Sequence, residues 1–321
     1  MLEPVNKIIL SKLTSEASAL SDTARYLLEL GGKRLRPKLC IEVFKMLKPD
    51  SEPSADVYKI SAGIEMIHMA TLLHDDIIDK SNLRRHQVSP RIKFGEDATL
   101  LSGDFLLVRA FGICSDFDQA IIRATEVACV ELTEGEVLET PLSRDSHNLE
   151  SYKNIAIKKT ASLFRLACFC GAHLAGSTEH EKHWAHFGEL LGLAYQMFDD
   201  IADALLDQTE LGKPSGLDLL ERKPSLVNIL WLNSGSPLAK EVLLTDSREA
   251  ASKLTEAALT EIRGSGGPLK AAMDLAESTQ TEAFNYLERH VLSETPRLRE
   301  QLSEITGLFS TLTQMLRSKI K

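Results

Sequence analysis

Apolar residues recur at helical spacing along most of the chain, and no alternation of apolar and polar residues continues long enough to indicate a strand. No Asn-Gly or Asp-Gly pair marks a hairpin. Glycine and proline gather at a few breaks, such as 29–37, 48–54 and 211–216. Between the breaks, the pattern predicts helices at 38–48, 55–80, 97–140, 148–176, 179–207, 224–233, 246–262, 268–291 and 296–320.

One of these helices is unusual because the segment 61–73 is apolar on almost all sides. Such a segment is typical of a helix at the centre of a bundle. The predicted helices carry no internal repeat. The sequence therefore predicts an all-α fold in which residues 1–321 form a single large helical domain.

Composition narrows the class of protein. The formal net charge of -9 argues against nucleic acid or an anionic membrane as the main partner. Five cysteines without a CxxC pair indicate reduced thiols, and Glu3 does not suit a signal peptide. No apolar run approaches the ~18 residues of a membrane span, so we expect a cytoplasmic protein without an integral membrane segment.

The first cluster of candidate chemistry lies at 72–85, "LLHDDIIDKSNLRR". On a helix, Asp75, Asp76 and Asp79 project to about one side. Carboxylates as close together as these repel one another unless a cation lies between them. Two arginines, Arg84 and Arg85, follow at once. This is a costly arrangement for a surface that merely keeps the protein in solution.

A second cluster, Asp199, Asp200 and Asp203, repeats the same spacing 124 positions later (199 minus 75), again at the end of an apolar helix. One such cluster alone would fit a solvated helix terminus, but two with identical spacing indicate a shared role. Carboxylates without His or Cys favour Mg²⁺. With nearby basic residues, the clusters predict a site for a metal-bound polyphosphate, and those residues are Arg84, Arg85, Lys159 and Lys213.

A second anion site is indicated at 31–37, "GGKRLRP", where Lys33, Arg34 and Arg36 follow two glycines. Alone, this segment would fit a helix C-cap followed by a solvated basic turn. Pro37 can open the next helix at its first position, and free amide groups at a helix N-terminus suit an anion. His68 is a possible further donor, although an isolated His is more often a core residue. Two anion sites imply two phosphorylated substrates.

With these motifs together, the chain resembles the trans-isoprenyl diphosphate synthases, the polyprenyl synthetase family, and most of all the long-chain octaprenyl-type enzymes. The resemblance runs from about residue 25 to 235. It includes both Asp-rich motifs, "GGKRLRP", "FGEDATLLSGDFLL", "KTASLF" and "LGKPSGLDLLERKPSL". It implies a helical bundle of the isoprenoid synthase type with a central cavity, a homodimer, and Mg²⁺ as cofactor with three ions per site.

The resemblance also implies a role for each matching residue. Mg²⁺ is held by Asp75, Asp76, Asp79 and Asp199, supported by Asp200 and Asp203. The allylic diphosphate is bound by Arg84, Lys159, Lys213 and Lys223. The diphosphate of isopentenyl diphosphate is bound by Lys33, Arg36, His68 and Arg85. Thr160 and Gln196 lie beside the reacting carbons.

Two stretches depart from the family pattern or suggest a different site. After "LRR" the family usually has Gly-Lys-Pro, whereas this chain has His86, Gln87 and Val88, so the conformation of that loop is open. "HEKHWAH" at 180–186 suggests a zinc site, but its spacing spreads the histidines around a helix. We interpret that stretch as a solvated first turn.

Product length depends on the residues just before the first Asp cluster. In the family, an aromatic residue there stops chain growth early. Ala70 and Thr71 are small, and the next candidates for the floor of the tunnel are deeper, from Ile67 on. We expect a long product of about eight isoprene units, with a geranylgeranyl or farnesyl product as the alternative. Ala70 would instead be small for close helix packing if it does not line the tunnel.

Three other functions would explain part of the sequence but not all of it. A terpene cyclase ionises an allylic diphosphate but needs no second diphosphate site, so Lys33, Arg36 and Arg85 would be unexplained. A non-catalytic partner subunit of a heteromeric synthase would be expected to lack the Asp-rich motifs, which are intact here. A structural protein that merely binds Mg²⁺ would have no use for the basic motifs.

Overall fold

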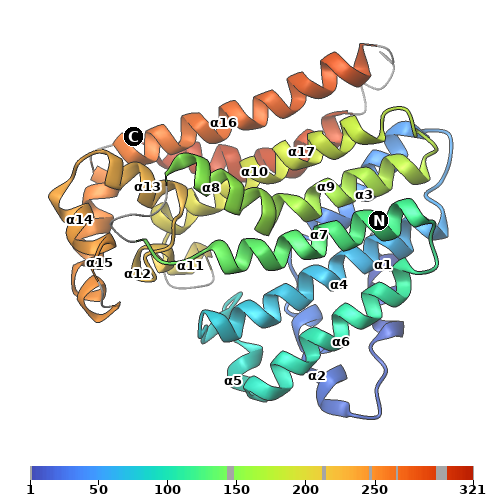
Figure 1. Cartoon of the computed structure of the whole chain (residues 1–321), viewed down its shortest axis with the longest axis horizontal. Coiled ribbons are helices and arrows are strands. Elements are labelled where there is room, and N and C mark those ends of the chain that lie inside the picture. Colours follow the sequence, from blue (N-terminus) through green and yellow to red (C-terminus); the bar gives the residue numbers. More distant parts are fainter. Residues whose placement is uncertain are drawn as a thin grey trace. The chain divides into compact units, whose positions relative to one another are not determined.

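The computed structural model describes residues 2–142, 148–211, 215–245, 248–264, 267–293 and 302–320 (Figure 1). The chain forms two compact units. The first unit comprises residues 1–129, 163–188 and 290–305, and the second comprises 130–162, 189–289 and 306–321. No helix in the described residues is long and apolar enough to cross a bilayer.

The first unit is built around one buried helix, α4 (Ala55–Ile78). All residues from Ile60 to Ile67 are buried, as expected for a helix that is apolar on all sides. Helices α1 (Glu3–Lys12), α3 (Leu35–Leu47) and α6 (Glu96–Cys114) pack against it. The remaining elements of this part of the chain are α2 (Ser18–Glu29), β1 (Leu83–Arg84), β2 (Gln87–Val88) and α5 (Pro90–Phe94).

Several helices contribute residues to both units, namely α7 (Gln119–Leu138), α9 (Ser162–Leu174), α10 (Glu181–Leu205), η2 (Glu288–Leu292) and α17 (Leu302–Lys319). The other elements belong to the second unit. They are α8 (Leu149–Ala156), η1 (Ile157–Ala161), α11 (Gln208–Leu211), α12 (Leu217–Leu220), α13 (Leu226–Asn233), α14 (Pro237–Leu243), α15 (Arg248–Gly264) and α16 (Gly267–Leu287). In this unit α13 packs against α14 and α16.

The predicted all-α class is confirmed, and most predicted helices are present. The range 97–140 is two helices, because the Asp118 side chain accepts hydrogen bonds from the amides of Ala120 and Ile121, both at 3.1 Å, and so starts α7. The predictions at 246–262 and 296–320 begin outside the described residues. The single domain stays a prediction.

The sequence pattern failed to predict the hairpin between α4 and α5. Strands β1 and β2 pair antiparallel, with Arg84 opposite Gln87. The two residues between them, Arg85 and His86, have φ values of 52° and 64°. Positive φ at both central positions is what a type I′ turn requires, and such turns usually contain Asn or Gly. The usual sequence signal is therefore missing although the turn is present.

One expected helix start also differs. Helix α3 begins at Leu35, so Pro37 is its third residue and not its first. Pro37 still lies within the first turn, where its missing N–H costs no helical hydrogen bond. The residue before the helix, Arg34, takes the left-handed conformation, with φ of 51°.

A glycine fixes the contact between α7 and η1, the π-helical turn that carries Lys159 and Thr160. A Cβ atom at Gly135 would lie 2.7 Å from the backbone nitrogen of Lys159 and 3.0 Å from its α-carbon. Neither atom can move without moving the helix. The absence of a side chain at Gly135 therefore sets how closely the two segments approach.

We predict that Gly135→Ala lowers the free energy of unfolding by about 1–3 kcal/mol, the usual cost of overpacking. Gly307→Ala, on α17, is the matched control, because a Cβ atom there meets nothing within 4 Å and Ala is the better helix former. Urea unfolding followed by circular dichroism measures both. Equal stabilities of the two variants would contradict the close contact at Gly135.

Candidate active site

The first Asp-rich motif lies at the C-terminal end of α4, and its three carboxylates differ in exposure. Asp76 is fully buried, whereas Asp75 and Asp79 are partly exposed. The Asp79 amide closes the helix by donating to the Asp75 carbonyl at 2.8 Å. The backbone therefore presents two of the carboxylates at the surface of the first unit and turns the third inwards.

Arg84 holds the buried carboxylate. Its Nε and Nη2 atoms lie 2.8 and 2.7 Å from Oδ1 of Asp76. The other oxygen, Oδ2, is buried and has no hydrogen-bond partner among the described residues. Burial raises the pKa of Asp76, and the hydrogen bond and charge of Arg84 oppose that effect. Half of this carboxylate is thus satisfied, and half still needs a donor or a cation.

The hairpin turns Arg85 towards the glycine-rich segment that follows α2. A guanidinium nitrogen of Arg85 donates to the carbonyl of Gly31. A Cβ atom at Gly32 would lie 2.6 Å from Nη2 of Arg85, and Gly32 has a φ of 128°. The positive φ of Gly32 therefore favours glycine, and a side chain there would displace the Arg85 guanidinium.

His68 lies within electrostatic reach of the basic residues of both segments. Burial lowers its pKa well below the usual value, and the charges of Arg36, Arg85, Arg84 and Arg34 lower it further, in that order. The imidazole is therefore neutral at neutral pH. The guanidinium of Arg36 also lies over the ring of Phe164, 4.9 Å from its centroid. The structure thus places the positive charges of Arg36 and Arg85 near the neutral imidazole of His68.

Arg34 and Lys33 have different surroundings. Arg34 is buried, forms an ion pair with the buried Glu65, and donates to the Leu28 carbonyl at 2.9 Å. Lys33 is exposed. The solvated basic turn therefore describes Lys33 but not Arg34, which is a structural residue of this turn. Glu65 gives no signal in the sequence, because it lies 31 positions away from its partner.

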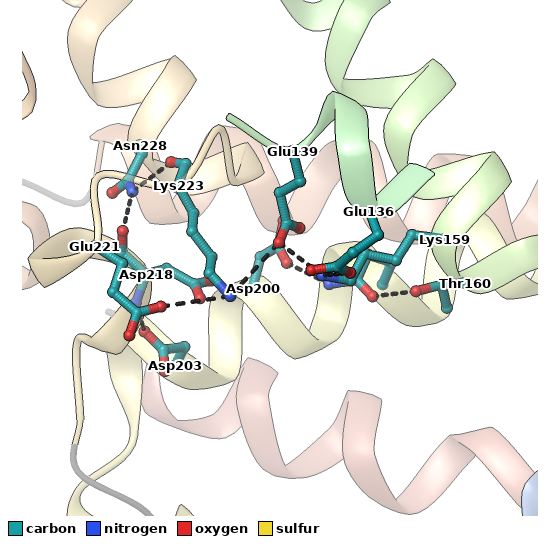
Figure 2. Close-up of polar contacts among 11 residues, drawn as sticks. Glu136, Glu139, Lys159, Thr160, Asp200, Asp203, Asp218, Glu221, Lys223 and Asn228 are labelled. Atoms are coloured by element: carbon teal, nitrogen blue, oxygen red, sulfur yellow. Dashed lines mark hydrogen bonds and ion pairs between the residues drawn. The ribbon is translucent and has the colours of Figure 1, made fainter. Parts of the chain in front are cut away.

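In the second unit, a chain of hydrogen bonds joins η1 to the second Asp-rich motif on α10. Thr160 Oγ1 donates to Gln196 Oε1 at 2.6 Å, and Gln196 Nε2 donates to Asp200 Oδ1 at 2.7 Å. The Leu226 amide donates to the other oxygen of Asp200 at 2.8 Å. Figure 2 shows Thr160 and Asp200 in this arrangement. The amide of Gln196 is thus fixed, with its oxygen bound to Thr160.

Asp200 keeps its proton more readily than an ordinary aspartate. Burial raises its pKa to about 7, and the charge of Asp199 acts in the same direction. Hydrogen bonds from the Leu226 amide and the Gln196 side chain oppose the rise. The pKa of the Tyr152 phenol is raised well above its usual value, first by burial and then by the charge of Asp200.

The carboxylates of the second motif are also divided by exposure. Asp199 is exposed, whereas Asp200 and Asp203 are buried. Oδ2 of Asp203 accepts a hydrogen bond from the Asp218 amide at 3.1 Å. The two buried aspartates therefore hold the segment from Asp218 to Leu226 against α10, and the exposed one is available to a ligand from outside.

Two of the predicted lysines share an acidic partner that the sequence reasoning did not use (Figure 2). Lys159 Nζ lies 2.7 Å from Glu136 and 2.6 Å from Glu139. Lys223 Nζ lies 3.5 Å from the same Glu139 oxygen and 3.4 Å from Glu221. Glu136 lies in the last turn of α7, and Glu139 directly follows the end of that helix. Their spacing of three is that of neighbours on one helix face, and this spacing was the available signal.

The remaining predicted residues differ in burial and in whether the structure describes them. Ala70 and Ile67 have no exposed surface, and Thr71 Oγ1 donates to the His68 carbonyl at 2.8 Å. Lys213 lies outside the described residues. The first unit thus brings together Asp76 with Arg84 and the basic residues around His68. The second unit brings together the two lysines around Glu139.

The donors present suit Mg²⁺. Both motifs supply only carboxylate oxygens, which hard cations prefer, and the unsatisfied Oδ2 of Asp76 lies at one motif. Within the described residues, no three His, Cys, Asp or Glu side chains converge on a common point as a metal site would require. Mg²⁺ commonly takes part of its ligands from water and phosphate.

The interpretation of 180–186 as a solvated first turn holds only in part. His180, His183 and His186 are all partly buried. The His183 ring stacks on the ring of His290 at a centroid distance of 5.0 Å and an interplanar angle of 7°. Partial burial follows from this packing between α10 and η2.

The chain is similar in sequence to proteins of one family. The sequence model of the family described as "Polyprenyl synthetase" matches residues 17–262. The octaprenyl diphosphate synthase of Escherichia coli is 34% identical over 91% of this chain and 90% of its own length. The geranylgeranyl diphosphate synthase of Methanosarcina mazei is 32% identical over 74% of this chain and 76% of its own length.

A solved structure agrees with the sequence relatives. The polyprenyl synthase from Caulobacter crescentus, complexed with calcium and isoprenyl diphosphate, matches with a TM-score of 0.83 and 30% identity. The match covers 99% of this chain and 94% of the other. The fold is therefore that of the isoprenoid synthases.

The pKa of Asp200 predicts a pH dependence of stability. Because its folded value of about 7 exceeds the ordinary value of ~3.9, the folded protein binds more protons than the unfolded chain between these two pH values. The contribution of Asp200 to the free energy of unfolding therefore falls as pH rises towards about 7, by at most ~1.4 kcal/mol per pH unit, and then levels off.

Asp200→Asn should remove this contribution, and the difference between wild type and variant isolates it from other titrating groups. Urea unfolding without metal, from about pH 5 to about pH 8, measures it. Asp50→Asn, at an exposed position, is the control. Parallel pH profiles for wild type and Asp200→Asn would show that the pKa of Asp200 is not raised.

Proposed function

This chain belongs to the polyprenyl synthetase family, and from that premise we propose that it condenses isopentenyl diphosphate with an allylic diphosphate to build a long prenyl chain. The protein is a prenyltransferase and a trans-prenyl diphosphate synthase. The proposal adds the substrates of each site, the residues that bind them, and the length of the product.

The observation that carries the proposal is the positive region of Arg36 and Arg85 around the neutral imidazole of His68. Three groups that can bind an anion occur together there, in the same unit as the buried pair of Asp76 and Arg84. A terpene cyclase has no use for this second anion site. A non-catalytic partner subunit has no use for two intact Asp-rich motifs, and a structural Mg²⁺-binding protein has no use for the basic residues.

We assign the allylic diphosphate to the residues of the Asp-rich motifs and their basic neighbours. Mg²⁺ would be held by Asp75, Asp79 and Asp199, which are accessible, and by the unsatisfied oxygen of Asp76. Asp200 and Asp203 support this site from the interior. When bound, Mg²⁺ supplies charge that stabilises the departing diphosphate. The number of ions proposed is three, by family resemblance.

The chain's own residues then account for the reaction. Arg84, Lys159, Lys213 and Lys223 take up negative charge as the C1–O bond of the allylic substrate breaks. Arg36, His68, Arg85 and Lys33 hold isopentenyl diphosphate so that its double bond attacks the allylic cation. The released diphosphate accepts the proton that is lost as the new double bond forms. Thr160 and Gln196 offer oxygen dipoles to the cation.

We propose a product of about eight isoprene units. The octaprenyl synthase of E. coli supports a long product, whereas the similar identity to a geranylgeranyl synthase keeps the shorter product as the alternative. Ala70 and Ile67 lie in the buried part of α4 ahead of the Asp-rich motif. Small or aliphatic residues at these positions would let a growing tail continue past the point where an aromatic ring stops it.

We also propose a cytoplasmic homodimer. Helix α6 exposes a row of large apolar residues to solvent, namely Leu100, Leu101, Val108 and Phe111. Their spacing places them along one side of the helix, where a second copy of the chain would cover them.

Incubation with labelled isopentenyl diphosphate, farnesyl diphosphate and Mg²⁺ tests the function, and we expect longer prenyl diphosphates. Asp75→Ala and Asp199→Ala should each lower turnover about a hundredfold or more, the scale of other lost electrostatic catalytic groups. Asp22→Ala, at an exposed position on α2, should not. Near-normal turnover of either motif variant at saturating Mg²⁺ would refute the assignment.

The product length is tested by Ala70→Phe. The new ring should shorten the product while chain elongation continues, because it would block the proposed tunnel near the first Asp-rich motif. Mass analysis of the dephosphorylated products gives the length distribution. Met69→Phe is the matched control, since it adds a ring at the neighbouring buried position. An active Ala70→Phe enzyme with unchanged products would place the tunnel elsewhere.

A further inference from the structure

The hairpin that carries Arg84 and Arg85 is too small to hold itself in place. It has two residues in each strand, and its two turn residues have positive φ without being glycine. An isolated two-stranded hairpin is at best marginally stable in water. Side chains from outside the hairpin must therefore determine where the two arginines lie.

Arg91, the second residue of α5, holds the chain entering the hairpin. Its guanidinium donates to the Lys80 carbonyl at 3.1 Å and to Oδ1 of Asn82 at 2.9 Å, and a third contact to the Ser81 carbonyl is longer, at 3.4 Å. It also pairs with Glu96 at 2.9 Å. These contacts fix the segment that directly follows the first Asp-rich motif.

Tyr26, on α2, holds the chain leaving the hairpin. Its hydroxyl donates to the Val88 carbonyl at 2.7 Å, and its ring lies 3.6 Å from Nζ of Lys93. Its ring also packs edge-on against Phe94 at 5.5 Å. The same helix leads into the turn where Gly31 accepts a hydrogen bond from Arg85. The hairpin is therefore docked on the α2 region at two points.

We propose that Tyr26 and Arg91 are positioning residues for the two diphosphate sites, and this inference rests on the proposed function. Tyr26 acts through the outgoing strand on Arg85, which belongs to the isopentenyl diphosphate site. Arg91 acts through residues 80–82 on Asp76 and Arg84, which belong to the allylic site. Neither residue needs to touch a substrate. Their effects on the two substrates are separable.

Tyr26→Phe removes the hydroxyl and keeps the ring that contacts Lys93 and Phe94. We expect the KM for isopentenyl diphosphate to rise about three- to tenfold, the range for one lost hydrogen bond, with kcat and the allylic KM unchanged within about twofold. Tyr58→Phe, on α4, is the matched control, because Tyr58 also contributes one partly exposed phenol to the first unit.

Arg91→Lys keeps the positive charge near Asp76 but loses the planar fork that reaches two groups at once. We expect the opposite pattern, with the KM for the allylic substrate and the Mg²⁺ requirement raised about three- to tenfold and the KM for isopentenyl diphosphate unchanged. Thermal unfolding of both variants shows whether a merely structural effect is present.

The measured KM values of the two variants decide whether Tyr26 and Arg91 are positioning residues. The proposal stands if Tyr26→Phe raises the KM for isopentenyl diphosphate and Arg91→Lys raises the KM for the allylic substrate, and the reverse pattern would overturn it. Unchanged constants in folded variants would overturn it, and so would parallel losses of kcat, both KM values and melting temperature. If the wild-type protein does not elongate geranyl or farnesyl diphosphate, the proposed function fails, and the positioning roles fail with it. Elongation by wild type with unaltered variants would overturn the positioning roles alone.

Discussion

The ion pair between Asp76 and Arg84 is the interaction on which the first unit's site depends. A fully buried carboxylate is strongly disfavoured unless it is paired, and only one of its two oxygens is paired here. Arg84 can reach Asp76 only because the hairpin folds back towards α4. The need to neutralise one buried charge thus determines the path of the chain after the Asp-rich motif.

The second unit also contains a buried carboxyl group, that of Asp200, but its hydrogen-bond partners are neutral. Asp200 accepts hydrogen bonds from an amide side chain and a backbone amide, and no basic side chain is among its hydrogen-bond partners in the described residues. A carboxyl in such surroundings favours its neutral form. Both motifs combine two kinds of aspartate. The buried ones bind neighbouring segments of the protein, and the exposed ones face outwards. Sequence spacing alone does not distinguish the two kinds.

Helices and both Asp-rich motifs could be predicted because they depend on local patterns. The apolar faces that end at Asp75 and at Asp199 repeat every three or four residues, so position in the sequence gives position on the helix. The buried pair of Arg34 and Glu65, and the bridge from Glu139 to Lys223, depend on which helices pack together. No local pattern encodes that choice. The hairpin was missed for another reason, since Arg85 and His86 occupy a turn that usually requires smaller residues.

Glu139 has a consequence for ligand selectivity. Because its carboxylate lies between Lys159 and Lys223, these lysines already have a counter-ion before any substrate arrives. An incoming anion must exchange with that carboxylate, so a singly charged anion gains little from the exchange. An anion with several charges can engage both ammonium groups and release Glu139 to solvent. On the proposed assignment of these lysines to the allylic diphosphate, the bridge disfavours the binding of chloride and other monoanions and favours polyanions.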